Sequence, residues 1–504
     1  MTLNETTNIF LERRERLAVR YTKFVILQLT LVFSSTLFAF LYFIIVIRQL
    51  PLLDVAILGK AVLVFNISRV FIHFGITYAV TQKVPPLIRK QEYDKAFSLT
   101  VYALKGGLIL SLLTALVLTT IMGLLLEIPF FYLLLTIIYD MLFILFQYVL
   151  VAYNAWIEIT KSSIMRNLRM FLYYTFIISF FLLMKNLIAI FYGWLVSVLI
   201  ILPIAIYFHP LRKMKYRSTK ETESLREIIT FGFPQYINYL LITFGGYFDQ
   251  LFMALFFTSE VFAIYFVLSR IVSNISSIMH ATRTGIIPTL SYFTGDEERE
   301  RKVFKLFLKF MMLLIAGPFI IAAIFSDVII ILLLSPEYLA GKIILSILFI
   351  AAFSRFINMI LLSLVLSKGD IKALPWITSI TLGIRILVVY LLSVFGSEGV
   401  ALAKAIAELF GIILLYVKYR KLIAVEKSFL LKLALICLIF FPIYFFRTGL
   451  LVFDIFLAVV SWIIYIIGLG IIRVLNEEEV RYLLGTKNKL LVYVAKIFIK
   501  VGRF

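Results

Sequence analysis

The sequence predicts an all-α integral membrane protein with about fourteen transmembrane helices. Three observations predict it: the composition, the apolar runs and the placement of the basic residues. Hydrophobic residues make up 62% of the 504 residues, charged residues only 15%, and the mean hydropathy is +1.04. A soluble domain carries roughly a quarter charged residues. A chain this apolar therefore needs lipid as its solvent, and no sizeable soluble domain is expected.

Apolar runs of spanning length follow one another along the chain. Six precede a polar, basic stretch at 209–227, six follow it, and two more lie beyond. The basic start leads directly into the first run, which we interpret as a span and not as a cleaved signal. The runs lie near residues 22–47, 55–80, 97–126, 129–152, 164–184, 187–208, 229–256, 260–292, 304–333, 342–366, 373–395, 399–417, 429–446 and 449–472.

The basic residues predict the orientation of these spans. Loops after the even-numbered spans are rich in lysine and arginine, whereas loops on the other side hold little more than Arg48, Lys185, Lys342 and Arg447. This asymmetry predicts a multi-pass protein of the plasma membrane with both termini in the cytoplasm. The net charge of +21 is spread over short loops and forms no basic domain, so no nucleic-acid partner is expected.

The chain also contains an internal repeat. Residues 54–97 begin DVAILGKAVLVFNIS, residues 260–304 begin EVFAIYFVLSRIVSNIS, and both segments end in a charged loop. Repeats in the same orientation predict two pseudo-symmetric six-helix lobes around a central cavity, related by an axis along the membrane normal. The expected divisions are an N-terminal lobe at 1–208 with a basic cytoplasmic start, a cytoplasmic linker at 209–227, a C-terminal lobe at 228–421, two further helices at 422–474 and a basic interfacial tail at 475–504.

Four arginines lie near the middle of predicted spans, where an ionisable side chain costs a few kcal/mol and needs a reason. They are Arg69, Arg270, Arg355 and Arg385, two from each half. Guanidinium groups bind phosphate through two parallel donors. We predict that the four converge on an anionic head group in the cavity, although pairing with buried acids is the alternative for each.

Three acids at membrane depth are candidates for coupling transport to an ion: Asp140, Asp249 and Glu408. Interhelical hydrogen bonding is the alternative for Asp249, and pairing with an arginine across helices is an alternative for both aspartates. Glu408 lies four residues after Lys404, so mutual neutralisation on one helix is its simplest interpretation. Lys60, Lys105, Arg166 and Arg169 lie near span ends, where snorkelling to the interface explains them. The single cysteine, Cys437, excludes an intramolecular disulfide and a cysteine-rich metal site.

Several segments together resemble a known family. They are residues 47–85, which begin IRQLPLLDVAILGK; residues 225–271, with Pro234, Asp249 and Tyr265 where the family tends to have them; IIPTLS at 286–291; and FGSEGVALAKAIAELF at 395–410. In this order, and with this number of spans, the chain resembles over nearly its whole length the polysaccharide and O-antigen flippases of the multidrug/oligosaccharidyl-lipid/polysaccharide (MOP) superfamily.

The resemblance implies alternating-access transport of a polyprenyl-(pyro)phosphate-linked oligosaccharide from the cytoplasmic to the outer leaflet. The implied partners are this lipid-linked glycan, membrane lipids and other polysaccharide-assembly proteins. No catalytic residue, metal site or cofactor is implied beyond a coupling ion, H⁺ or Na⁺. Related lipid II flippases use arginines of the first, second and eighth spans, and Arg69 and Arg270 fall in the last two. The first span offers only uncharged polar groups, which makes lipid II itself a less expected substrate.

Two other functions compete with this interpretation. A multidrug or organic-cation exporter of the same superfamily should have acids and aromatic residues in its cavity, and twelve spans would suffice. A membrane enzyme acting on lipid-linked glycans usually needs a large outer loop or an acidic metal motif. No outer loop here exceeds about a dozen residues, and none has clustered carboxylates. The arginine excess and the fourteen predicted spans favour transport of a lipid-linked anion.

Overall fold

The computed structural model describes residues 34–71, 74–213, 224–283, 297–367, 373–420 and 442–471, with 428–429, 431–433 and 435 between the last two ranges. The predicted cytoplasmic N-terminus, the predicted tail at 475–504 and most of the predicted linker lie outside these residues. The predicted first span is described only from residue 34, and most of the thirteenth is not described.

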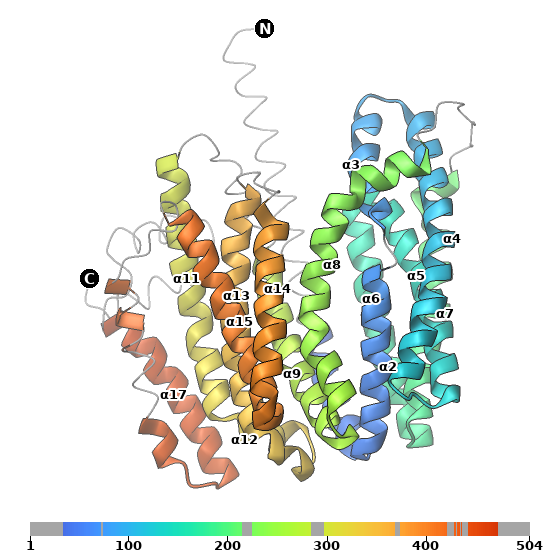
Figure 1. The fold of residues 1–504 in the computed structure, drawn as a ribbon. Helices are drawn as coiled ribbons and strands as arrows, with labels where there is room; N and C mark the ends of the chain where they lie inside the picture. Colours follow the sequence, from blue (N-terminus) through green and yellow to red (C-terminus); the bar gives the residue numbers. More distant parts are fainter. Residues whose placement is uncertain are drawn as a thin grey trace. The chain divides into compact units, whose positions relative to one another are not determined.

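The described residues form helices and no strands (Figure 1). The all-α class is therefore confirmed. Helices occupy the second to the twelfth predicted spans and the fourteenth. They are α2 (Leu52–Phe71), α3 (Ile76–Arg89), α4 (Tyr93–Leu125), α5 (Phe130–Ala155), α6 (Ile159–Met184), α7 (Ile188–Tyr207), α8 (Leu225–Phe256), α9 (Ser259–Arg283), α11 (Glu297–Ile324), α12 (Ser326–Leu333), α13 (Lys342–Ser367), α14 (Ala373–Leu392), α15 (Gly396–Tyr419) and α17 (Leu451–Ile471).

Length and apolar character identify membrane-spanning stretches among these helices. In the described part of the chain nine stretches are long and apolar enough to cross a bilayer, or ten when the bent pair α2 and α3 is counted as one span. One of the nine, Leu374–Tyr419, contains both α14 and α15. The chain is thus a multi-pass membrane protein, and fourteen spans are consistent with the structure.

Two compact units divide the chain, residues 1–284 and 285–504. In the first unit, α8 and α9 pack against α2, and α8 also packs against α3. The start of α8 carries a capping box, in which the Ser224 hydroxyl accepts from the Glu227 N–H and the Glu227 carboxylate accepts from the Ser224 N–H. The domain bounds predicted from the repeat stay a prediction.

Close backbone contact joins α3 to α8. Gly75 precedes α3 with a φ of +77°, a left-handed conformation that glycine adopts without strain. A Cβ atom on Gly232 of α8 would lie 2.0 Å from the Gly75 carbonyl oxygen. The two helices therefore meet where neither has a side chain. Gln82 also donates a hydrogen bond to Gln235 at 2.9 Å across the same interface.

In the second unit, α13 packs against both α11 and α15, and α14 packs against α15. The last described helix, α17, packs against α11, where the ring of Tyr465 fills the space left by Gly317 and the Tyr465 hydroxyl donates to the Leu313 carbonyl. Arg447 connects the start of α12 to the start of α17, because its guanidinium binds both Asp327 and Asp454. These contacts attach the fourteenth predicted span to the unit.

Candidate anion-binding site

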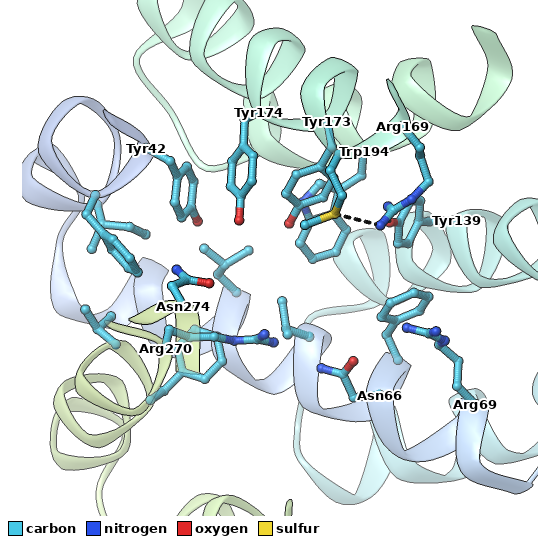
Figure 2. Close-up of a pocket in the computed structure, with 18 residues that line it drawn as sticks. Tyr42, Asn66, Arg69, Tyr139, Arg169, Tyr173, Tyr174, Trp194, Arg270 and Asn274 are labelled. Atoms are coloured by element: carbon cyan, nitrogen blue, oxygen red, sulfur yellow. Dashed lines mark hydrogen bonds between the residues drawn. The ribbon is translucent and has the colours of Figure 1, made fainter. Parts of the chain in front are cut away.

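A pocket of about 210 Å³ lies within the first unit, between α2, α5, α6, α7 and α9. Its polar lining consists of three arginines, two asparagines, four tyrosines and a tryptophan. Figure 2 shows Tyr42, Tyr174 and Tyr173 along one side, opposite Asn274, Arg270 and Asn66, with the hydroxyls of Tyr42 and Tyr174 directed into the space between. The ten polar lining residues are Tyr42, Asn66, Arg69, Tyr139, Arg169, Tyr173, Tyr174, Trp194, Arg270 and Asn274.

Two glycines bring the helices of this pocket together. On α2, a Cβ atom at Gly59 would lie 2.9 Å from the rings of Phe262 and Phe266 on α9. This close approach places Arg270, one turn after Phe266, beside the pocket side of α2. On α7, a Cβ atom at Gly193 would lie 2.7 Å from backbone atoms of Ile177 on α6. Small residues at helix crossings are the usual means of close packing in membranes.

Aromatic rings hold the three arginines. The guanidinium carbon of Arg69 lies 4.4 Å from the ring centre of Phe143 and 5.0 Å from that of Phe65. The guanidinium carbon of Arg169 lies 4.8 Å from the same Phe143 ring. That of Arg270 lies 5.3 Å from Phe266. A ring face attracts a cation but carries no net charge, so these contacts orient the guanidinium groups without neutralising them.

Within the described residues, none of the three arginines forms an ion pair with a carboxylate. Arg169 donates to the Tyr139 hydroxyl at 3.3 Å and to the Met170 sulfur at 2.9 Å. The Nε atoms of Arg69 and Arg169 are buried and have no hydrogen-bond partner. The pocket therefore contains three positively charged guanidinium groups with N–H groups available to donate. Such groups are typical of an anion-binding site.

The structure brings together Arg69 and Arg270, which the sequence predicted for one site. It adds Arg169, which the sequence analysis had placed at a span end. Helix α6 begins at Ile159, five residues before the predicted run, so Arg169 lies almost three turns inside the helix and lines the pocket. The aromatic residues Tyr173 and Tyr174, one turn further on, were the available signal.

The other two predicted arginines belong to the second unit. Arg385 of α14 is buried, and its Nη2 lies 2.5 Å from Glu408 Oε1 on α15. Asn358 of α13 donates to the other oxygen of Glu408 at 3.1 Å. Glu408 thus binds Arg385, and not Lys404 as its spacing had favoured. Arg355 lies one turn before Asn358, and its contact with a substrate stays a prediction.

The two aspartates among the ion-coupling candidates are buried in the first unit. Asp140 of α5 accepts hydrogen bonds from Ser68 at 2.6 Å and from Thr119 at 2.8 Å. Asp249 of α8 accepts from the Tyr265 hydroxyl at 2.6 Å. Their coupling roles, like that of Glu408, stay predictions. The described residues contain no cluster of three or more His, Cys, Asp or Glu side chains able to hold a metal ion.

Comparison with known proteins agrees with this fold. A family model described as a polysaccharide biosynthesis protein (Polysacc_synt_3) matches residues 48–342. No curated protein matches the sequence.

Among solved structures, the lipid II flippase MurJ in an inward closed conformation is similar at a TM-score of 0.70 and 15% identity, over 90% of this chain and 99% of that one. An inward-facing multidrug resistance MATE transporter of the MOP superfamily follows at a TM-score of 0.62 and 15% identity, over 79% and 98%. A mutant of the Vibrio cholerae MATE transporter VcmN gives 0.56 and 16%, over 82% and 98%.

Proposed function

Because the chain belongs to the family of polysaccharide biosynthesis proteins and has the fold of the MOP superfamily, we propose that it transports a lipid-linked glycan. It moves a polyprenyl-(pyro)phosphate-linked oligosaccharide from the cytoplasmic to the outer leaflet by alternating access, and no covalent bond changes. The proposal is based on the pocket of the first unit, which is lined by three arginines without carboxylate partners among the described residues.

The energetic argument starts from the cost of those charges. A guanidinium group at membrane depth is expensive unless it is paired or hydrated. Aromatic contacts recover part of the cost but leave the positive potential in place. A ligand with negative charge lowers the energy further, whereas an organic cation is repelled. The pocket therefore favours an anionic substrate over the cationic drugs of a multidrug exporter.

The geometry favours a phosphate group among anions. The guanidinium carbons of Arg69 and Arg169 lie 4.4 and 4.8 Å from the same Phe143 ring, so their separation cannot exceed these two distances together. A diphosphate is long enough to reach both guanidinium groups, and their remaining N–H groups can donate to its oxygens. The asparagines and tyrosine hydroxyls around the arginines suit the first sugar, which needs both hydrogen-bond partners and an aromatic face.

A transporter of this kind has a clear physical task. Carrying a sugar-phosphate head group through hydrocarbon is prohibitive, because its polar groups would lose water without replacement. The pocket supplies replacement donors and acceptors while the polyprenyl tail stays in lipid. The basic loops are predicted to face the cytoplasm, so transport to the outer leaflet moves the head group away from their side of the membrane.

The experiment that tests this proposal is translocation by the full chain in proteoliposomes, using a fluorescent polyprenyl-pyrophosphate oligosaccharide. Three variants remove one pocket charge each: Arg69→Gln, Arg169→Gln and Arg270→Gln. We expect each to weaken substrate binding by about tenfold or more, the size of one hydrogen bond to a charged group. Translocation at sub-saturating substrate should fall accordingly.

Arg212→Gln is the matched control. Arg212 also lies over an aromatic ring, 4.3 Å from the centre of Tyr207, but it is exposed and outside the pocket. It should leave translocation unaltered. Equal activity of wild type and all three pocket variants would remove the arginines from the mechanism. Absence of translocation by wild type, together with efflux of cationic dyes, would indicate the exporter function.

A further inference from the structure

Asp140 lies directly behind the arginine pocket, and its carboxyl group has an unusual environment. The side chain is fully buried between α2, α4 and α5. Both of its hydrogen bonds, from the hydroxyls of Ser68 and Thr119, go to the same oxygen, Oδ2. The other oxygen, Oδ1, has no hydrogen-bond partner. No lysine or arginine of the described chain forms an ion pair with it.

These contacts suit a neutral carboxyl group better than a carboxylate. A buried ionised carboxylate is costly without a cation and without donors on both oxygens. The same geometry accommodates a proton, because Ser68 Oγ lies 3.1 Å from the Phe65 carbonyl oxygen as well as 2.6 Å from Asp140 Oδ2. Asp140 can then donate to Ser68 while Ser68 donates to Phe65. These hydrogen bonds therefore accommodate Asp140 in either protonation state.

Two residues, Ser68 and Phe143, connect Asp140 to the pocket. Ser68, its hydrogen-bond partner, immediately precedes Arg69 on α2. Phe143, one turn after Asp140 on α5, holds the Arg69 guanidinium at 4.4 Å. An ionised Asp140 therefore repels an anion bound at Arg69, and because Asp140 is buried, little water screens this repulsion. A protonated Asp140 carries no charge, so the full charge of Arg69 attracts the anion.

Few other titratable groups act on Asp140. Arg69 on α2 carries the nearest charge, and Tyr139 is its neighbour on α5. Arg169 on α6 reaches Tyr139 and not Asp140 itself. On α4 no side chain between Lys105 and Glu127 is ionisable. The ionisable side chains on α3 and α7 form no hydrogen bond or ion pair with Asp140: Tyr78, Lys83, Arg89, Tyr192 and Tyr207.

We propose that Asp140 is a proton-binding site coupled to the arginine pocket, so that a phosphate-type anion and one proton bind together and leave together. The inference rests on the anion-binding function proposed above and adds the ion that accompanies the substrate. The coupling is reciprocal: a proton on Asp140 strengthens anion binding, and the anion strengthens proton binding to the same degree. The proton comes from solvent and returns to it, and no bond of the substrate changes.

Calorimetry on the full chain in detergent tests the coupling. The ligand is a soluble dialkyl pyrophosphate diester, whose own charge stays constant between pH 6 and 8. Titrations in two buffers with different ionisation enthalpies count the protons taken up per anion bound. For wild type we expect net proton uptake and an affinity that falls as the pH rises, by at most about tenfold per pH unit for one proton.

Asp140→Asn should keep the neutral hydrogen-bonding pattern, bind the diester with an affinity that does not depend on pH, and take up no proton. Asp94→Asn, which alters an exposed aspartate outside the pocket, should behave as wild type. Thr119→Val removes one donor that stabilises the ionised form, so proton uptake should move to higher pH. This second variant retains the test if Asp140→Asn fails to fold.

The outcomes separate the two proposals. If wild type binds the diester and Asp140→Asn takes up the same number of protons, the coupling is wrong and the anion pocket remains. An unaltered pH profile in Thr119→Val would also contradict the coupling. If wild type does not bind the diester at any pH, the proposed anion-binding function is wrong, and the proposed proton coupling is then wrong as well.

Discussion

Phe143 is the residue on which the geometry of the pocket depends most, because the guanidinium groups of Arg69 and Arg169 both lie against its ring. Each cation–π contact is worth about 0.5–2 kcal/mol where water is excluded. The ring therefore holds two charges close together that would otherwise repel each other. It is a positioning residue, since it acts on the substrate through the arginines.

Replacing Phe143 by leucine should weaken anion binding by about tenfold or more, because both guanidinium groups lose their ring. The core should remain, at a cost of about 1–2 kcal/mol in unfolding free energy. Titration with the dialkyl pyrophosphate diester measures the first effect and thermal unfolding in detergent the second. Phe146→Leu is the control: Phe146 is fully buried on the same helix and packs against the Phe143 ring, but no guanidinium group of the described residues lies over its own ring. Equal affinity in both variants would contradict the positioning role.

His209 follows α7 and lies outside the membrane spans. Its ring packs edge-on against Tyr153 at 4.8 Å, and its Nδ1 accepts from the Leu211 N–H at 3.2 Å. Burial lowers the pKa of His209 to about 4. The unfolded chain binds this proton near pH 6.5, so the folded state binds fewer protons between the two values.

Folding stability should therefore fall as the pH is lowered from about 6.5 towards 4, where the unfolded state gains the proton first. His209→Asn keeps an acceptor for the Leu211 N–H and removes the titration. The melting temperature of this variant should lie below that of wild type at pH 7, and the difference should shrink as the solution becomes acidic. A difference that does not change between pH 7 and 5 would contradict this assignment.

Sequence alone located part of the pocket and missed the rest for a physical reason. Arg69 and Arg270 lie deep within their apolar runs, so their cost in lipid identified them. Arg169 lies in the weakly apolar first half of α6, where a helix end and a helix interior look alike in sequence. The contact between the Arg169 guanidinium and the Phe143 ring could not be predicted from sequence either, because the two residues belong to different helices.

At the scale of helices, the contact between α3 and α8 depends on the absence of side chains. Gly232→Ala would place a methyl group 2.0 Å from the Gly75 carbonyl oxygen, which neither backbone can relieve without separating the helices. We expect a loss of about 1–3 kcal/mol or more, read as a lower melting temperature. Gly383→Ala on α14 is the control, because its Cβ would have no neighbour within 4 Å and alanine favours helix. A Gly232 variant as stable as this control would contradict the close contact.

Over the described residues of the whole molecule, the order and positions of the helices followed from hydropathy, because lipid imposes span length and apolar character on every spanning helix. The resemblance stated from sequence is confirmed at the level of the family. Side-chain partners were harder to predict. Spacing along one helix favoured Lys404 for Glu408, but tertiary packing brings Arg385 and Asn358 to it from two other helices.

The arginines of the two units have different partners. In the second unit Arg385 is neutralised by Glu408, and a Cβ atom on Gly411 would lie 2.5 Å from the Asn358 amide that completes the cluster. In the first unit Arg69, Arg169 and Arg270 have ring partners and no carboxylate. One cluster is built for stability and the other retains its charge, so substitutions in the two should separate stability from binding.

Arg385→Gln should lower the unfolding free energy by about 3–5 kcal/mol, because it leaves the carboxylate of Glu408 buried without its cation. The double variant Arg385→Gln with Glu408→Gln should recover most of that loss, since neither charge remains. Arg169→Gln should cost little stability and weaken binding of the pyrophosphate diester by about tenfold or more. Thermal unfolding and calorimetry on the same preparations compare the three. If Arg169→Gln destabilises the protein as strongly as Arg385→Gln while anion affinity stays that of wild type, Arg169 is a structural residue and the pocket must bind its ligand without it.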